Sequence, residues 1–320
     1  MIRKLTFSMA ALLLLGQIAW AQTEAPKSET GYRFTPGIEL KTTDVKSQHR
    51  SSTCWSYSSL SFIESEMLRM GKPAVDLSEM FVVWHTYNGK ADRYVRMQGN
   101  TNFGPGGAFH DAMWVLKNFG MMPEEAFTGN TIGEPLPVHG ELDEVSKAFV
   151  DAVLKNRNRK LSPAWKPAFE GILNGYLGTI PKNFNYQGKS YSPLSFAKDV
   201  VGINPDDYIE IGSFMHHPFY EKFIIEIPDN WLWDAIYNVP LNEMMEVIDY
   251  ALANGYTIAW GADVSDKGFA TKAAGVAVVP DVDFTEMSDS EISKWETLSE
   301  DEKNKELYKF DKPGKEKEIT

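Results

Sequence analysis

The stretch Gln48-His49-Arg50-Ser51-Ser52-Thr53-Cys54-Trp55-Ser56-Tyr57 decides how this chain is interpreted. It contains the single cysteine of the 320 residues, and it lies where a polar segment meets a helical pattern. Downstream, side chains recur at helical spacing until Gly71-Lys72-Pro73 ends the pattern: Trp55, Ser59, Phe62, Ile63, Glu66 and Met70. We therefore expect a helix with Thr53 as its N-cap and Cys54 in its first turn.

The N-terminus has the pattern of an export signal. Arg3 and Lys4 form a positive region, Met9 to Leu15 form a short apolar core, and Ala19-Trp20-Ala21 has the small-x-small pattern of a cleavage site. We expect a signal peptide over residues 1–21, cleavage near Ala21-Gln22, a flexible lead over 22–35, and a secreted or periplasmic protein without a membrane segment. An uncleaved anchor is the alternative.

Export makes the single cysteine informative. Exported proteins use cysteines mostly in disulfides, and one cysteine cannot form an internal bridge. Cys54 is therefore either a reactive thiol or a small buried hydrophobe. At the start of a helix, free backbone N–H groups and a partial positive charge stabilise a thiolate, which can attack an amide carbonyl. The position of Cys54 favours the reactive thiol.

This stretch resembles the active-site segment of papain-like cysteine peptidases, where a glutamine precedes the cysteine by six positions and an aromatic residue follows it. Gln48, Cys54 and Trp55 match that pattern. The resemblance implies that Cys54 is the nucleophile and that Gln48 and the Cys54 backbone N–H form the oxyanion hole. It also assigns Trp55 to the substrate-binding wall. Ser51-Ser52-Thr53 departs from the family, because the usual Cys-Gly before the Ser-Cys-Trp core is absent.

Two later segments match the same family in the same order. Leu77-Ser78-Glu79 opens a second predicted helix. Gly104-Pro105-Gly106-Gly107 precedes an apolar helix that contains Ala112, Val115 and Leu116 and ends at Gly120. In the family, a Gly-Gly edge pairs with the extended substrate backbone, so the resemblance implies that Gly106 and Gly107 bind substrate. A plain helix-entry loop is the alternative.

The long segment from about Leu136 to Pro193 resembles the aminopeptidase C and bleomycin hydrolase branch, as does the stretch 208–214. So do a predicted helix over 241–254 and the alternating segment 256–264, and the whole resemblance covers roughly residues 36–270. For the helix we predict Asn242 as the cap, Gly255 as the stop, and a buried stripe of Met245, Ile248, Ala251 and Leu252. For residues 256–264 we predict a strand of a barrel-like sheet.

These segments predict an α+β, papain-like two-domain fold. We expect a helical left domain with an insertion over residues 36–200, a partial β-rich right domain over 201–282, and a charged helical or disordered insertion over 283–320.

A cysteine peptidase also needs a histidine near the sulfur and a third group that orients it. The six histidines are His49, His85, His110, His139, His216 and His217. In the resembling group the stretch around His216 and His217 precedes the last helix and strand, whereas the catalytic histidine and asparagine follow them. We therefore expect both catalytic residues beyond Thr320, a truncated chain, and no activity from these residues alone.

The remaining composition limits the function. A net charge of −12 argues against a nucleic-acid partner, which needs a basic surface. No cluster has zinc-ligand spacing, so we expect no metal and no cofactor. The resemblance implies peptide substrates and a homo-oligomer, a hexamer in that branch. It does not decide between exopeptidase and endopeptidase action. An inactive, exported peptide-binding relative and an accidental resemblance are the alternatives.

Overall fold

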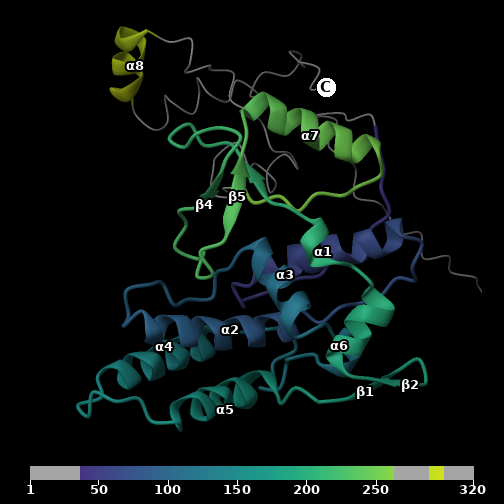
Figure 1. Ribbon diagram of the computed structural model, residues 1–320, viewed down its shortest axis with the longest axis vertical. Coiled ribbons are helices and arrows are strands. Elements are labelled where there is room, and N and C mark those ends of the chain that lie inside the picture. The colour runs from purple at the N-terminus through teal and green to yellow at the C-terminus, as the bar shows by residue number, and fades with distance from the viewer. Residues whose placement is uncertain (1–36, 263–287, 299–320) are drawn as a thin grey trace, which may run out of the picture. The chain divides into compact units, whose positions relative to one another are not determined.

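The computed structural model describes residues 37–262 and 288–298 (Figure 1). Residues 36–261 form one compact unit, and α8 (Asp289–Glu296) belongs to a second. The predicted signal peptide and flexible lead lie outside the described residues. Within the described residues, no helix is long and apolar enough to cross a membrane.

Five helices build most of the first unit, and they are joined by loops and by the 3₁₀ turn η1 (Glu124–Ala126). They are α1 (Cys54–Arg69), α2 (Glu79–Arg96), α3 (Phe109–Asn118), α4 (Gly140–Leu154) and α5 (Trp165–Leu177). The helices predicted after Thr53, after Ser78 and after the glycine segment are confirmed. Ser78 caps α2, because its hydroxyl oxygen accepts a hydrogen bond from the Phe81 N–H at 3.1 Å.

The helix α2 lies at the centre of this arrangement and packs against the other four (Figure 1). Its buried side chains cover most of its circumference, and a partly exposed stripe that includes Asn88, Asp92 and Arg96 is left on the remaining side. The core around it is apolar and includes Leu60, Phe81, Tyr87, Phe169 and Leu173. This core holds α1, and with it Cys54, in a fixed position.

A small hairpin and a second short sheet follow. Strands β1 (Phe184–Tyr186) and β2 (Lys189–Tyr191) pair antiparallel, and both residues of the connecting turn have positive φ, as in the hairpin turns that match strand twist. The short helix α6 (Pro193–Phe196), the π-helical turn η2 (Ala197–Val201) and the 3₁₀ turn η3 (Pro205–Asp207) then lead to three strands.

The three-stranded sheet has the order β3-β5-β4, with β3 (Ile211–Gly212) parallel and β4 (Lys222–Ile224) antiparallel to β5 (Ala235–Asn238). Helix α7 (Leu241–Ala253) follows it. This mixture of helices and small sheets confirms the α+β class. Residues 36–261 form one compact unit, and the domain boundary at residue 200 stays a prediction.

Two predictions for α7 are wrong. Pro240, not Asn242, precedes the helix as its N-cap, because the helix already begins at Leu241. The predicted stripe is not buried: Met245 is exposed, and Ile248, Ala251 and Leu252 are half-buried. The cause is size, because strands of two to four residues cannot cover a helix of 13.

The segment 256–262 is not a strand, so that prediction is also wrong. A strand requires a hydrogen-bonded neighbour, and no described strand pairs with this segment. Asp263 and Val264, the last two residues of the predicted strand, lie outside the described residues. Of the predicted charged insertion, the structure describes α8 and its flanking residues.

Candidate active site

Cys54 is the first residue of α1, and it is exposed. Thr53 precedes it in the N-cap position, as predicted, but its side chain does not cap the helix. Instead the Thr53 hydroxyl is buried and lies 2.5 Å from the hydroxyl of Ser51. The thiol therefore stands at the positive end of a 16-residue helix, on the solvent side.

The turn from Gln48 to Thr53 is held by its own serines. Ser51 donates to the Gln48 carbonyl oxygen through its backbone N–H at 3.2 Å and its hydroxyl at 2.9 Å. Ser52 has φ 57°, in the left-handed region where glycine is favoured. Ser52 thus adopts a glycine conformation at the position where the papain-like segment has its glycine.

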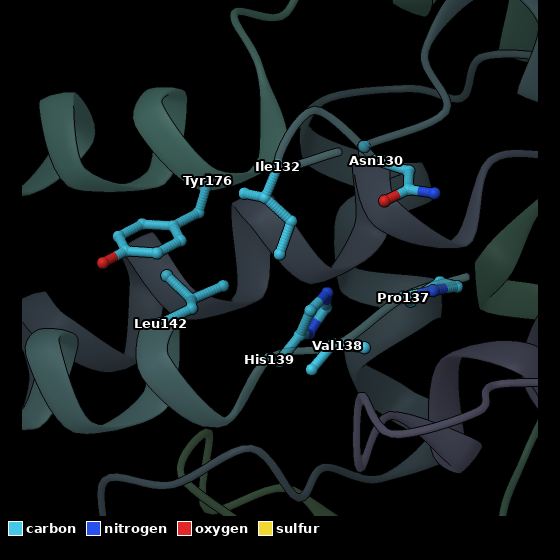
Figure 2. Close-up of a pocket in the computed structure, with 8 residues that line it drawn as sticks. Asn130, Ile132, Pro137, Val138, His139, Leu142 and Tyr176 are labelled. Atoms are coloured by element: carbon cyan, nitrogen blue, oxygen red, sulfur yellow. The ribbon is translucent and has the colours of Figure 1, made fainter. Parts of the chain in front are cut away.

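A neighbouring loop fixes this turn from the other side. The Arg50 N–H donates to the Pro137 carbonyl at 3.1 Å, and the His139 N–H donates to the Arg50 carbonyl at 3.1 Å. The His139 ring lines a cavity of about 10 Å³ with Val138, Leu142 and Tyr176 (Figure 2). That volume suits one water molecule at most, so this cavity is a packing feature and not a substrate site.

Gln48 is half-buried, and its Oε1 is buried without a hydrogen-bond partner among the described residues. One short turn separates Gln48 from Cys54. The oxyanion role of Gln48 stays a prediction.

Trp55 and the glycine segment are in direct contact. The Trp55 indole Nε1 donates to the Pro105 carbonyl oxygen at 2.9 Å. A Cβ built on Gly107 would stand 2.7 Å from the Trp55 ring and 2.6 Å from Asp111 Oδ2, and one on Gly106 would overlap the Asp229 carboxylate. Trp55 and Asp111 are buried, so close packing requires glycine at position 107, whereas the neighbour of Gly106 is the end of a side chain that can rotate away.

Lys90 organises the same segment, and the sequence analysis did not identify it. Its buried ammonium donates to the carbonyl oxygens of Gly104, at 3.0 Å, and Gly106. Burial lowers the pKa of Lys90, while Asp111 and Asp229 act in the opposite direction. A lysine within the buried face of α2, between Tyr87 and Tyr94, was the signal that could have revealed it.

Side chains of the protein occupy the backbone carbonyl groups of the glycine segment. Lys90 draws the Gly104 and Gly106 carbonyls toward the core. Trp55 holds the Pro105 carbonyl in the same way, at 2.9 Å, so the backbone acceptors of Gly104, Pro105 and Gly106 are all occupied by side chains of the protein. Burial raises the pKa of Asp111, which accepts the Ala108 N–H at 3.1 Å, to about 6.

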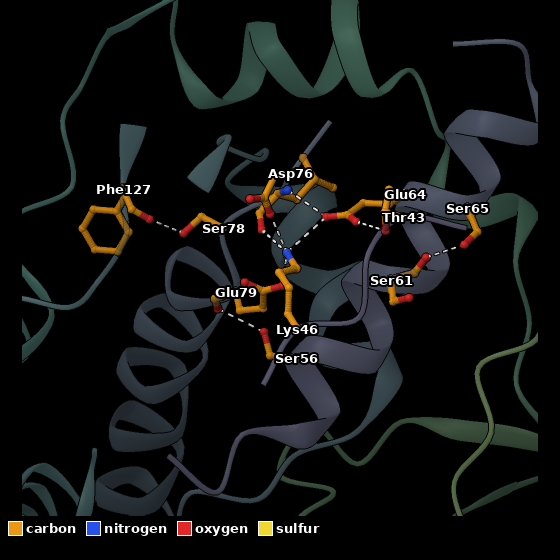
Figure 3. A network of polar contacts seen from close by, with 11 residues as sticks. Thr43, Lys46, Ser56, Ser61, Glu64, Ser65, Asp76, Ser78, Glu79 and Phe127 are labelled. Carbon is orange, nitrogen blue, oxygen red and sulfur yellow. Dashed lines mark hydrogen bonds and ion pairs between the residues drawn. The ribbon is translucent and has the colours of Figure 1, made fainter. Parts of the chain in front are cut away.

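An ion-pair network behind α1 fixes the helix against α2 (Figure 3). The Lys46 ammonium lies 2.6 Å from Asp76 and 3.4 Å from Glu64, pairs with Glu79, and donates to the Leu77 carbonyl at 3.2 Å. Glu64 in turn accepts the Leu77 N–H at 2.8 Å. The network therefore joins the segment before Cys54 to the start of α2.

Two carboxylates at this network, Glu79 and Glu124, have raised pKa values because nearby positive charge does not offset their burial. Burial raises the pKa of Glu79 to about 7, although Lys46 opposes the shift. Glu124, from η1, has a pKa of about 8 because it is buried and faces Glu79 and Asp76. The Ser56 hydroxyl donates to the Glu79 carbonyl at 3.0 Å and adds a direct contact between the first turns of α1 and α2.

None of the six histidine rings makes a hydrogen bond to Cys54 within the described part of the chain. His110 Nδ1 lies 3.1 Å from Glu210, and the rings of His216 and His217 both contact Glu226. The His85 ring stacks on Phe119. His139 lines the small cavity, and His49 is exposed. Among the described residues, therefore, no histidine is bonded to the thiol as a general base would be.

Comparison with known proteins gives the fold. No protein-family model matches the sequence, and no curated protein matches it. Among solved structures, the fold is similar to that of PepW from Lactobacillus rhamnosis, with a TM-score of 0.56 and 18% sequence identity. The match covers 69% of this chain and 59% of the PepW chain, so the chain spans less than two thirds of that protein.

Proposed function

We propose that this protein is an exported, thiol-dependent peptide hydrolase of the aminopeptidase type, in which Cys54 attacks the peptide carbonyl. The observation that carries the proposal is the exposed thiol at the first residue of α1, beside a tryptophan that is bonded to the glycine segment. The similarity of fold to PepW and the papain-like pattern of Gln48, Cys54 and Trp55 support it.

In this proposal the Cys54 thiolate forms a bond to the carbonyl carbon, and the carbonyl oxygen gains the negative charge. The Gln48 Nε2 and the Cys54 backbone N–H stabilise that oxygen. The histidine expected beyond Thr320 would take the proton of the thiol and give it to the nitrogen as the intermediate expels the amine. It would then take a proton from the water that attacks the thioester carbonyl and return it to the sulfur as the acid leaves. The peptide lies along Gly106 and Gly107 against Trp55.

Because Cys54 is the only cysteine, thiol labelling reports on one site. An epoxysuccinyl probe and iodoacetamide should label the protein at pH 7 faster than they label glutathione, and Cys54→Ser should abolish labelling. Labelling no faster than that of glutathione would argue against an activated thiol.

Hydrolysis tests the rest of the site. In a protein that carries the histidine expected beyond Thr320, Gln48→Ala should lower turnover of a fluorogenic peptide by about 10²–10³-fold while thiol labelling persists. Asn118→Ala, an exposed amide on α3, is the matched control and should leave turnover unchanged. Cleavage of a free peptide but not of its N-acetylated form would support aminopeptidase action, and cleavage of both would support an endopeptidase.

The second candidate is an inactive peptide-binding relative, and the absence of a histidine bonded to Cys54 within residues 37–262 favours it. Peptide binding without any hydrolysis, lost on substitution of Trp55 but not of Cys54, would decide for this candidate.

We also propose that the chain is exported with cleavage near Ala21-Gln22 and assembles as a homo-oligomer. N-terminal sequencing of the mature protein and light scattering test these two points. An intact residue 1 in the mature protein, or a monomer at micromolar concentration, would refute the corresponding part.

A further inference from the structure

Three side chains meet at the edge of the small sheet, outside the Cys54 site. His216 and His217 lie between β3 and β4, and Glu226 follows β4. The Glu226 Oε2 atom lies 2.6 Å from His216 Nε2 and 3.2 Å from His217 Nε2. One ligand atom from each residue lies within 4.8 Å of the other two.

We propose that His216, His217 and Glu226 bind a divalent transition-metal ion of the zinc type. Two imidazole nitrogens and one carboxylate oxygen are a ligand set that zinc uses in proteins. Ligand atoms around a tetrahedral ion at about 2.0–2.1 Å stand about 3.3 Å apart, so the three side chains need only small movements to accommodate it.

The backbone that carries both histidines is fixed by a buried amide. The Asn238 Nδ2 donates to the carbonyl oxygens of Phe214 at 2.8 Å, His217 at 2.9 Å and Pro218 at 3.2 Å. Its Oδ1 accepts the Phe214 N–H at 2.8 Å. The turn that carries the histidines is therefore already ordered before the ion binds, so binding does not have to order it.

Aromatic rings orient the two imidazoles. The His217 ring stacks on Phe223, with centroids 4.2 Å apart and an angle of 22°, and Phe214 meets the His216 ring edge-on at 5.9 Å. Such support is the role that surrounding residues play in metal sites. A chance ion pair on the surface would not need a stacked ring and an amide clamp behind it.

The site is accessible and differs from a closed structural zinc site. Glu226 and His216 are exposed, and His217 is half-buried. With three protein ligands, the remaining coordination position opens to solvent and is available to water. The ion would connect the turn before β4 to the segment after it. Two adjacent histidines and a glutamate nine residues later do not form a familiar zinc spacing, so the site could not be predicted from the sequence.

The test uses the full chain with Cys54→Ser, so that the thiol cannot bind metal, and without a polyhistidine tag. Zinc is titrated in competition with a chromophoric chelator, and cobalt binding is followed by its visible absorption. We expect one equivalent of zinc per chain. His216→Ala, His217→Ala and Glu226→Gln should each weaken binding at least about ten-fold, since even the loss of an outer partner has that effect.

Two matched variants control for charge and for the number of histidines. Glu221→Gln removes an exposed carboxylate next to the same strand, and His49→Asn removes an exposed histidine at a positive φ that asparagine tolerates. Both should bind zinc like the parent. Glu226→Gln preserves the side-chain shape, so it remains informative if a histidine variant does not fold. No saturable binding, or equal affinity in Glu226→Gln and Glu221→Gln, would overturn the proposal.

Discussion

The Trp55 indole Nε1 donates a hydrogen bond to the Pro105 carbonyl oxygen at 2.9 Å, 50 residues away in the sequence. This bond joins the first turn of α1 to the glycine segment. Lys90 holds the same segment from the core side through the carbonyls of Gly104 and Gly106. Trp55 and Lys90 thus hold the glycine segment through three hydrogen bonds to its carbonyl oxygens, so its shape depends on both side chains.

Gly107→Ala should destabilise the protein by about 1–3 kcal/mol, because its methyl group would overlap the Trp55 ring and Asp111. Urea unfolding followed by tryptophan fluorescence measures the effect. Gly104→Ala is the control, since a Cβ there would meet its nearest neighbour, Asn102, at 3.7 Å. Equal unfolding midpoints for the two variants would contradict the packing argument.

Local signals made the first three helices predictable from the sequence. Ser78 and the apolar spacing after it define the start of α2, and Gly120 follows the end of α3. The exposed position of Cys54 at a helix start also follows from such local information. These features depend on residues within one or two turns of each other, which a sequence displays directly.

The errors and omissions involve contacts between distant segments. Lys90 looks like an ordinary helix residue until Gly104 and Gly106 fold over it. The metal cluster needs β4 to bring Glu226 back to His216. Periodicity predicted a buried face for α7, but a face becomes buried only if a neighbouring element is large enough to cover it.

Ser52→Gly should stabilise the protein by about 1 kcal/mol, because a left-handed conformation strains any residue with a Cβ. Ser58→Gly, inside α1, should have the opposite effect, since glycine weakens a helix interior. Thermal unfolding of both variants and of the parent protein shows whether each change raises or lowers the stability. Destabilisation by Ser52→Gly would show that the serine side chain contributes more than the strain costs.

Glu124→Gln should stabilise the protein at alkaline pH and have little effect near pH 5. The folded-state pKa of Glu124, about 8, lies above its ordinary value of 4.5, so the folded state keeps a proton that the unfolded state releases. Stability from this group is present below pH 4.5 and is lost as the pH rises toward 8. Urea unfolding at pH 5, 6.5 and 8 measures the difference, with exposed Glu125→Gln as the control. A difference that does not change with pH would refute the assignment.

His85→Phe should become increasingly stabilising as the pH falls below about 6.5. Burial lowers the pKa of His85 to about 3, so between these values the unfolded state binds a proton that the folded state does not. Stability from the neutral ring is present above pH 6.5 and is lost on acidification, at up to about 1.4 kcal/mol per pH unit. Phenylalanine can keep the stacking on Phe119. Unfolding at pH 8, 6 and 5 tests this, and His85→Leu, also apolar, must show the same trend although it packs differently.

Asn238→Ala should lower the free energy of unfolding by about 2 kcal/mol or more. The buried amide bonds the Phe214 N–H and three carbonyl oxygens, and the methyl group of alanine can make none of these hydrogen bonds. Asn254→Ala, which removes one exposed hydrogen bond to the Tyr250 carbonyl, is the control and should change stability by less than about 0.5 kcal/mol. Urea unfolding gives both values. If the turn that Asn238 holds also positions His216 and His217, Asn238→Ala should weaken zinc binding while the protein remains folded, whereas Asn254→Ala should not. Unchanged zinc affinity in a folded Asn238→Ala variant would show that the turn holds its shape without the amide.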